Sequence, residues 1–300
     1  MLLRSLAAAA VLAAWLLASG GDALRVVVVG ANGRTGRKVV DVSLRKGYET
    51  VAVTRSGELA QPSYSTASLL TTLAGDVGNP ASLQLSAADA VVFCASASKE
   101  GGTPQQVDRD GAIAVGKACI AAGVPRYVIV SSGAVSKPWS PVYLFLNLFG
   151  GIMKAKIEGE DAVRALYKQQ PNAALGYTIV RPGGLTEEEP LGVAGLELNQ
   201  KDEKSGRISR WDVASICIEC ITEPAASRVT LEAYNKDTGK PLAEVGLSNL
   251  FKLKTAGEAG GGGGGAFERR GATWKDIFAG LLTACGGGVG EWSVLFVQQV

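Results

Sequence analysis

The sequence lacks histidine altogether, and it carries few charges for a chain of 300 residues. Histidine is the commonest general base in enzymes and the commonest metal ligand, so its absence excludes a serine-hydrolase triad and a zinc site built from imidazoles. We therefore expect no metal site. Charged residues make up 19% of the chain and the formal net charge is only +2. This balance does not indicate a polyanionic partner, and we expect no binding to nucleic acid.

Cysteine is also scarce. The five thiols, at Cys94, Cys119, Cys217, Cys220 and Cys285, form an odd set without dense spacing, which disfavours a disulfide framework. Cys217 and Cys220 have the C-x-x-C spacing of redox and metal sites, but they lie in an apolar helical pattern with no second pair nearby. We interpret them as buried core thiols.

No apolar run reaches the length of a membrane span. Near the N-terminus, Arg4 precedes an apolar segment at 6–18, and small residues follow it up to Ala23. These three regions are typical of a signal peptide, and the apolar segment is shorter than the roughly 20 residues that a span needs. We interpret 1–23 as a targeting segment, with a shallow uncleaved anchor as the alternative. It is compatible with secretion and with the first step of a two-step import into a plastid.

Glycine, in contrast, is abundant, and three glycines stand where they carry information. Gly30, Gly33 and Gly36 follow the apolar run at 24–29 directly and precede an amphipathic helical pattern. Glycines at a strand-to-helix turn let the backbone approach a pyrophosphate, and the helix that follows offers unpaired N–H groups and a positive dipole end. The spacing is G-x-x-G-x-x-G, and we interpret this turn as the site of a dinucleotide.

Short apolar strands then alternate with helical stretches, which is typical of a parallel sheet covered on both faces. We therefore predict a doubly wound, mostly parallel α/β sheet of the Rossmann type over 24–254, as a single domain with a C-terminal extension. Right-handed crossovers place the carboxyl ends of the strands at one edge, where ligands bind. The predicted strands lie at 24–29, 50–54, within 69–74, and at 90–95, 126–132, 177–181 and 229–233, with a helix over about 105–122.

The end of the second strand bears on the choice of cofactor. An acidic residue there would bind the ribose of NAD, whereas an arginine would pair with the 2′-phosphate of NADP. Arg55 stands at this position, and Glu58 comes too late for the NAD role. Arg34, inside the glycine turn, is a second candidate partner for the phosphate. We expect NADP(H) rather than NAD(H); two solvated surface arginines are the alternative.

Several stretches together resemble the atypical short-chain dehydrogenase/reductases, and most of all their NAD(P)H-binding, NmrA-like branch, which includes plant and algal plastid proteins. The stretches lie at 28–36, 75–77, 127–132, 177–185 and 207–214. The resemblance covers about 24–235 and implies a Rossmann fold, a nicotinamide cofactor and a plastid location, with the secretory pathway as the alternative. The candidate cofactor residues are Gly30, Asn32, Gly33, Arg34, Thr35, Gly36, Arg55, Asp76, Val77, Ala95, Ser96, Ser131, Lys156 and Pro182.

The chain departs from the family at the catalytic tyrosine. Reductases of this kind usually place a tyrosine four residues before a lysine that lowers the pKa of the phenol. Lys156 resembles that lysine, but Ile152 stands four residues before it, and the alternative register from Lys154 reaches Gly150. Tyr143 lies far upstream, in what we expect to be an apolar loop at 141–149.

Two functions follow. In the first, the protein is an NADPH-dependent oxidoreductase acting on a small carbonyl, quinone or enone: Lys156 anchors the nicotinamide ribose, Ser131 or Ser132 orients a substrate carbonyl, and the lysine or a water supplies the proton. In the second, it binds NADP(H) without chemistry, as a redox sensor or an assembly factor on a partner complex. For Lys156, a surface pair with Glu160 at i,i+4 is the alternative.

The remaining segments are less specific. The aromatic stretch at 138–146 would line a pocket, dock on a membrane or a partner, or simply pack. The charge run at 187–189 is expected to be a solvated loop. Residues 255–271 form a glycine-rich linker, and 272–300 form a helix and a tail. Trp274, Ile277, Phe278 and Leu281 share one face of this helix, which we expect to dock back on the domain; a detachable partner-binding helix is the alternative.

Overall fold

A computed structural model describes residues 23–60, 66–98, 101–245 and 267–283. The predicted targeting segment except its last residue, most of the predicted linker and the tail beyond 283 lie outside the described residues. Within the described ranges, no helix combines the length and the apolar character needed to cross a membrane.

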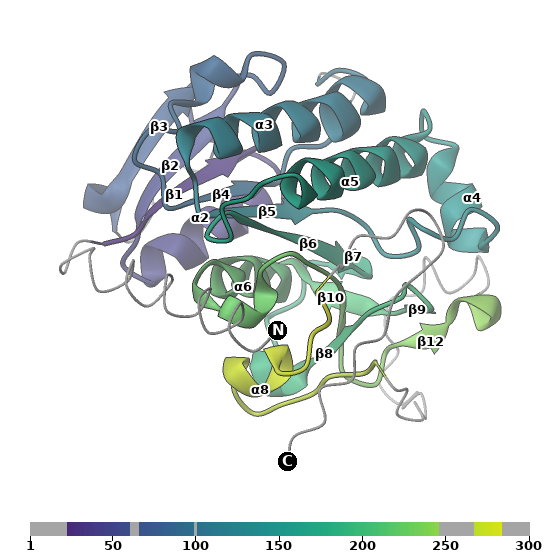
Figure 1. Ribbon diagram of the computed structural model, residues 1–300. Coiled ribbons are helices and arrows are strands. Elements are labelled where there is room, and N and C mark those ends of the chain that lie inside the picture. The colour runs from purple at the N-terminus through teal and green to yellow at the C-terminus, as the bar shows by residue number, and fades with distance from the viewer. Residues whose placement is uncertain (1–22, 61–65, 99–100, 246–266, 284–300) are drawn as a thin grey trace.

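The described chain forms an eight-stranded sheet that is parallel except at one edge (Figure 1). The seven strands expected from the sequence are all present and parallel to one another. The order of the strands reverses between β1 and β4, which lie side by side, as in a Rossmann fold. The eighth, β8, pairs antiparallel with β11 and was not expected. In spatial order the strands are β3 (Leu70–Ala74), β2 (Glu49–Thr54), β1 (Arg25–Val29), β4 (Ala90–Phe93), β5 (Arg126–Val130), β6 (Gly176–Pro182), β11 (Val229–Asn235) and β8 (Leu196–Asn199).

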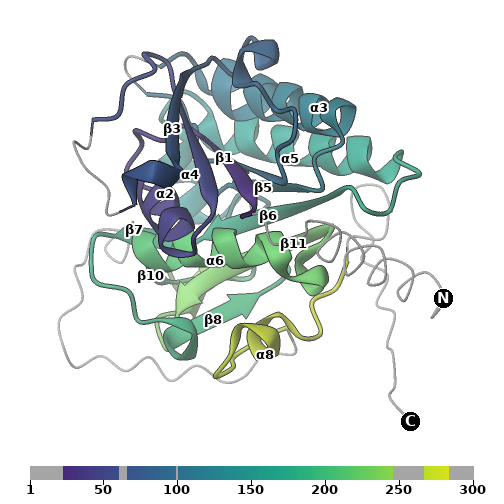
Figure 2. The same ribbon diagram turned by 90° about the vertical axis from the view of Figure 1, so that its left-hand side faces the viewer.

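Helices cover both faces of the sheet and create two cores (Figure 2). One core contains residues of α2 (Gly36–Arg45) and α6 (Arg210–Thr222), and the other contains residues of α3 (Ala112–Ala122) and α5 (Ile152–Lys168). Alternate residues of β1 enter opposite cores, with Val26 and Val28 in the first. Because each fully buried valine contributes about 1.5–3 kcal/mol of transfer free energy, a continuous apolar strand is stable only in such a doubly covered position.

The first core also contains the two cysteines of the C-x-x-C pattern. Cys217 and Cys220 are fully buried on α6, and both are free thiols. Burial raises the pKa of both thiols well above their ordinary value. The interpretation as core thiols is therefore confirmed.

Two helical regions differ from expectation. The helix predicted over about 105–122 begins as a π-helical segment, η3 (Gln105–Gly111), before α3. The apolar loop predicted at 141–149 is wrong, because α4 (Pro141–Asn147) forms there. The Ser140 side chain accepts a hydrogen bond from the Tyr143 amide and Pro141 occupies the first turn, so this short sequence carries a complete N-terminal cap.

Small elements and the C-terminal helix complete the described fold. β7 (Gly184–Thr186) pairs with β10 (Arg207–Ser209), and β9 (Lys204–Ser205) pairs with β12 (Lys240–Pro241). α8 (Trp274–Phe278) begins with a capping box between Thr273 and Asp276. Its Ile277 and Phe278 are fully buried in the α2–α6 core, so this helix lies back against the domain beside β8 (Figure 2).

Candidate functional site

The glycine-rich turn leaves β1 at Gly30, whose φ of +83° lies in the left-handed region that favours glycine. The Gly30 amide donates to the Val53 carbonyl at 3.1 Å, and a Cβ on Gly30 would come within 2.7 Å of the Ala95 amide nitrogen. A Cβ on Gly36 would overlap the Gly30 carbonyl oxygen. The turn is this tight because its corners are glycine, and it lies between the ends of β1, β2 and β4.

The turn leads into an N-terminus of α2 that suits an anion. Thr35 precedes the helix without a capping hydrogen bond from its side chain, and the first turn contains no acidic residue. The leading N–H groups of a helix have no partner within the helix and carry the positive end of its dipole. In this helix the Arg37 and Lys38 amides already donate to the Gly33 and Thr35 carbonyls at 3.0 and 2.9 Å. The fit to the pyrophosphate of a dinucleotide therefore rests on the close backbone approach at Gly30 and on the positive end of the helix dipole.

Asn32 ties the glycine turn to the loop after β2. Its side-chain amide donates to the Glu58 carbonyl at 2.9 Å and accepts from the Ala60 amide at 2.8 Å. Thr54 also donates to the Glu58 carbonyl, at 3.1 Å. These bonds fix the loop that carries Arg55, an exposed residue at the carboxyl end of β2.

Arg34 has an acidic partner that the sequence did not suggest. Its guanidinium forms an ion pair with Glu187 at 2.6 Å, and Glu187 also holds Arg210 at 2.8 Å. Although partial burial opposes the shift, the hydrogen bond from Arg34 and the charge of Arg210 lower the pKa of Glu187. Residues 187–189 form an exposed loop, as expected for a charge run. Glu187 is nevertheless ion-paired within it, and a phosphate at Arg34 would share the guanidinium with this carboxylate.

Lys156 forms an ion pair with Asp108 of η3, a residue that sequence reasoning missed. The Lys156 Nζ atom lies 2.7 Å from an Asp108 carboxylate oxygen, and the Asp108 side chain is fully buried. The same carboxylate accepts from the Ser96 hydroxyl at 2.7 Å and from the Ala97 amide at 2.9 Å. Asp108 thereby joins α5 to the end of β4. The alternative surface pair between Lys156 and Glu160 is not present among the described contacts.

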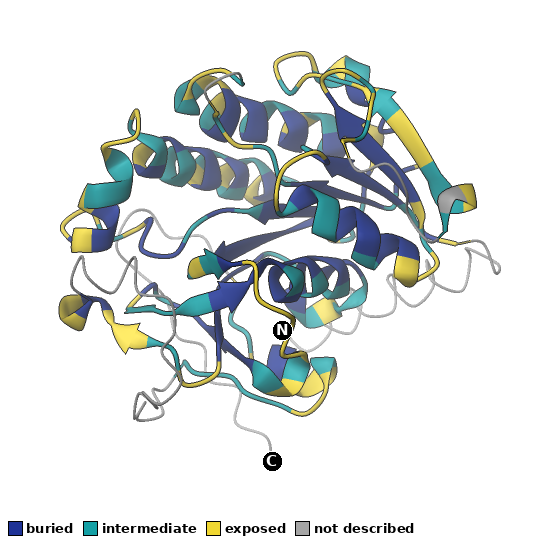
Figure 3. Ribbon diagram, turned by 180° about the vertical axis from the view of Figure 1, so that it is seen from behind, coloured by how far each residue is buried: buried dark blue, intermediate teal, exposed yellow. Residues whose placement is uncertain are grey.

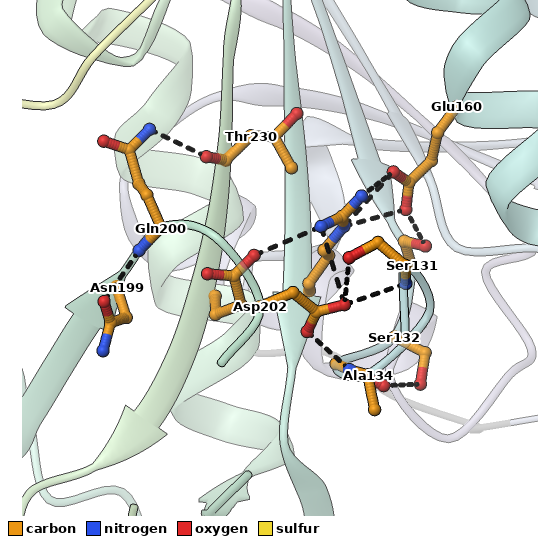
Figure 4. Close-up of polar contacts among 12 residues, drawn as sticks. Ser131, Ser132, Ala134, Glu160, Asn199, Gln200, Asp202 and Thr230 are labelled. Carbon is orange, nitrogen blue, oxygen red and sulfur yellow. Dashed lines mark hydrogen bonds and ion pairs between the residues drawn. The ribbon is translucent and has the colours of Figure 1, made fainter. Parts of the chain in front are cut away.

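Glu160 instead binds Ser131 (Figure 4). The Ser131 hydroxyl donates to Glu160 at 2.5 Å, and Arg181 and Arg164 donate to the other carboxylate oxygen at 2.6 and 3.0 Å. Burial alone would raise the pKa of Glu160, but the two guanidinium groups outweigh it and lower the pKa. Glu160 is therefore an ionised carboxylate that accepts the hydrogen bond of the Ser131 hydroxyl. The neighbouring Ser132 is only half-buried, and its hydroxyl donates to the Gly133 carbonyl at 3.1 Å.

Arg181 is the centre of a buried charge network at the ends of β5, β6 and β11. Besides Glu160, its guanidinium contacts Glu232 at 3.3 Å and Asp202 at 3.7 Å. Asp202 accepts from the Ala134 amide at 2.6 Å, which holds the loop after β5 in place (Figure 4). Burial raises the pKa of Glu232 to about 8; the nearby Asp202 charge adds to the shift and Arg181 opposes it.

The position of the usual tyrosine is apolar in the structure as in the sequence. Ile152 begins α5 and packs against the buried cluster that contains Tyr143 and Met153. Tyr143 is itself 8% exposed on α4. Burial raises the pKa of its phenol and the Glu158 charge adds to this effect. Tyr143 therefore lacks the lowered pKa that the family's catalytic tyrosine gains from its lysine.

The other predicted cofactor residues also lie at the carboxyl edge of the sheet. The Asp76 carboxylate accepts from the Gly78 amide at 2.7 Å in the turn after β3. Val77 lies so close to Gly111 of η3 that a Cβ there would meet it at 2.7 Å. Pro182 ends β6, and its carbonyl accepts from the Gly133 amide at 2.8 Å. The topology thus brings the ends of six strands, β1 to β6, to one edge.

Comparison with known proteins agrees with this geometry. Residues 30–224 match the NAD(P)H-binding family. An uncharacterised chloroplastic protein of Arabidopsis thaliana is 32% identical over 219 residues, which cover 69% of this chain and 75% of that protein.

Two solved structures share the fold. An oxidoreductase from Lactococcus lactis has a TM-score of 0.59 at 25% identity, covering 74% of this chain and 94% of that one. A short-chain dehydrogenase/reductase from Veillonella parvula, solved in complex with NADP, has a TM-score of 0.57 at 18% identity, covering 72% and 96%. With the family match over most of the described domain, the chain belongs to the NAD(P)H-binding family and is an atypical short-chain dehydrogenase/reductase of the NmrA-like type.

Proposed function

We propose that the protein is an NADPH-dependent oxidoreductase that reduces a small carbonyl, quinone or enone. The observation that carries the proposal is the Lys156–Asp108 pair. Gly30 lies against Ala95, and the next residue, Ser96, shares the Asp108 carboxylate with Lys156. A continuous set of contacts therefore connects the dinucleotide turn to an ammonium group held in a fixed place.

The side chains have distinct roles in this reaction. Bound NADPH would supply the hydride. Lys156 offers N–H donors to a ribose hydroxyl or a substrate oxygen, and Asp108 restrains its position. Because the Ser131 hydroxyl donates its hydrogen bond to Glu160, the Ser131 oxygen presents lone pairs and acts as an acceptor. The Ser132 hydroxyl likewise donates to the Gly133 carbonyl, so Lys156 is the side chain left to donate to a substrate carbonyl, and the proton comes from the lysine or from water.

The preference for NADP is supported by the position of Arg55. The residue follows β2 directly, on a loop that Asn32 and Thr54 hold in place. A guanidinium at this point would form charge-assisted, bidentate hydrogen bonds with a 2′-phosphate. Arg34 would contribute less, since Glu187 already neutralises part of its charge.

Ile152 favours a second candidate function. With an apolar residue in place of the tyrosine, the pocket would hold NADP(H) without transferring hydride, and the protein would report redox state or support assembly of a partner complex. Both functions use the same cofactor site and differ only in whether chemistry follows binding.

Turnover separates the two functions. Purified protein is mixed with NADPH and a panel of quinones, aldehydes and enones, while cofactor binding is followed by NADPH fluorescence. If the protein is a reductase, Lys156→Gln lowers the turnover number by about a hundredfold, as expected for loss of a general acid or its positioning group. The control Lys154→Gln changes an exposed lysine two residues away and leaves turnover unchanged. Tight NADPH binding without oxidation by any substrate would favour the sensor.

We also propose that residues 1–23 direct the protein to a plastid, an assignment supported by the chloroplastic relative. A fluorescent protein fused after residue 24 should then enter plastids of algal or plant cells. A fusion that accumulates in the secretory lumen would contradict the proposal.

A further inference from the structure

Large apolar side chains on the surface are concentrated in one place. Among the described residues, four of the five exposed large hydrophobic side chains lie within 139–149, and the fifth is Leu191. The four are Trp139, Leu144, Leu148 and Phe149, with exposures of 88%, 52%, 79% and 62%, and they form what we call the α4 patch. Isolated exposed apolar residues are ordinary, whereas a concentration of this kind marks an interaction surface.

The α4 patch is carried by an ordered helix. Leu144 and Leu148 are four residues apart and therefore project from the same side, and the Phe149 ring contacts the Phe145 ring with centroids 5.6 Å apart. The opposite side of α4 is anchored, because Val142 and Tyr143 are buried against the loop after β5 and the start of α5. Figure 3 shows exposed segments at the end of the molecule where α4 lies. The buried side of α4 therefore packs against the core, and the exposed side chains of the α4 patch take no part in that packing.

The charge around the patch has one sign. The stretch from 133 to 157 contains no aspartate or glutamate, although the chain has 28 acidic residues, and its charges are Lys137, Lys154 and Lys156. Lys156 is turned inward to Asp108, which leaves Lys137 and Lys154 flanking the patch. Glu158, the first carboxylate after this stretch, is held by Arg109 at 3.4 Å and forms a longer, exposed pair with Lys154 at 3.9 Å.

We propose that the α4 patch docks on the surface of a bilayer that contains anionic lipid. Trp139, Leu148 and Phe149 would enter the boundary between headgroups and acyl chains, where tryptophan is favoured. Lys137 and Lys154 would face the anionic headgroups. A contact between two copies of this face is disfavoured, because it would bring lysines of both copies together without a carboxylate from this stretch.

Vesicle binding tests the proposal on the full chain. The protein is sedimented with vesicles of phosphatidylcholine alone and with vesicles that also contain phosphatidylglycerol. The variant W139S/L148S/F149S should bind the anionic vesicles at least about tenfold more weakly than wild type. L191S, which removes the exposed leucine outside the patch, should bind as wild type does. K137Q/K154Q should reduce binding to anionic vesicles to the level seen with phosphatidylcholine alone.

A local readout separates the patch from the apolar segment at 6–18, which could hold any variant on a vesicle. Brominated lipids quench tryptophan on contact with the acyl region, so wild type should show a quenched component of emission that W139F lacks. The proposal is overturned if Trp139 contributes no quenched emission and the triple variant binds as wild type does. It is also overturned if the triple variant loses only self-association in size-exclusion chromatography, because a second copy then covers the patch.

Discussion

At the scale of a single residue, Arg55 carries the proposed preference for NADPH. We expect Arg55→Ala to weaken NADPH binding by tenfold or more, the range for a lost charge-assisted hydrogen bond, while NADH binding changes little. Both dissociation constants are measured by cofactor fluorescence. Arg45→Ala removes an exposed arginine from the opposite end of α2 and serves as the control. An Arg55→Ala protein that keeps its preference for NADPH would show that the 2′-phosphate lies elsewhere.

The polar contacts of Lys156 show where sequence reasoning reaches its limit. The lysine itself could be found, because its motif occupies one helix. Its partner Asp108 lies on another helix, η3, and nothing in the sequence distinguishes Asp108 from any other acidic residue of a helix. The i,i+4 spacing offered a Lys156–Glu160 pair as the alternative, but Glu160 binds Ser131 and Arg181. Spacing along a helix predicts which side chains of that helix can pair with each other. The rotation of the helix against the sheet then determines whether such a pair forms or whether each side chain binds a residue of another element.

The glycine turn permits a prediction at the scale of the element. Gly36→Ala places a methyl group against the Gly30 carbonyl, so the turn must open, and we expect NADPH affinity to fall by tenfold or more. Gly47→Ala is the control: Gly47 has a positive φ of +77°, unlike Gly36, and a Cβ there meets no atom within 4 Å. This control should lose about 1 kcal/mol of stability and keep its affinity for NADPH. Equal affinities for the two variants would contradict the role of the turn.

A helix or strand could be predicted when its own residues show which of its faces are buried. Most of the parallel strands could be recognised because they are buried on both faces and appear as continuous apolar runs. The exception is β3, an edge strand with two threonines and no fully buried residue. β8 could not be recognised, since it has only four residues and alternates Leu196 and Leu198 with polar side chains. The π-helical winding of η3 left no distinct mark either, because it depends on packing against α5. The sequence does mark the start of α4, through the Ser140 cap and Pro141, and this signal was missed.

At the scale of the whole molecule, the Arg181 network connects β6 and β11 with α5 and, through Asp202, with the loop after β5. Its charges are unequal: Glu160, Asp202 and Glu232 all face Arg181, and only Glu160 has a second arginine. One oxygen of Glu232 finds no hydrogen-bond partner among the described residues. Glu232 is therefore the group that stays protonated, and it makes the stability of the fold depend on pH.

The pKa of Glu232 is about 8 in the folded protein and near 4.5 in the unfolded chain, so between these values the folded state binds the extra proton. The stability that this group confers is complete below about pH 4.5 and is lost as the pH rises toward 8. Glu232→Gln mimics the protonated form and should remove this loss. In urea unfolding at about pH 6 and about pH 9, the advantage of Glu232→Gln over wild type should grow by about 2 kcal/mol, the sign and order set by linkage. Glu188→Gln, an exposed change, should not alter the slope. Parallel curves for wild type and Glu232→Gln would mean that Arg181 keeps Glu232 ionised throughout.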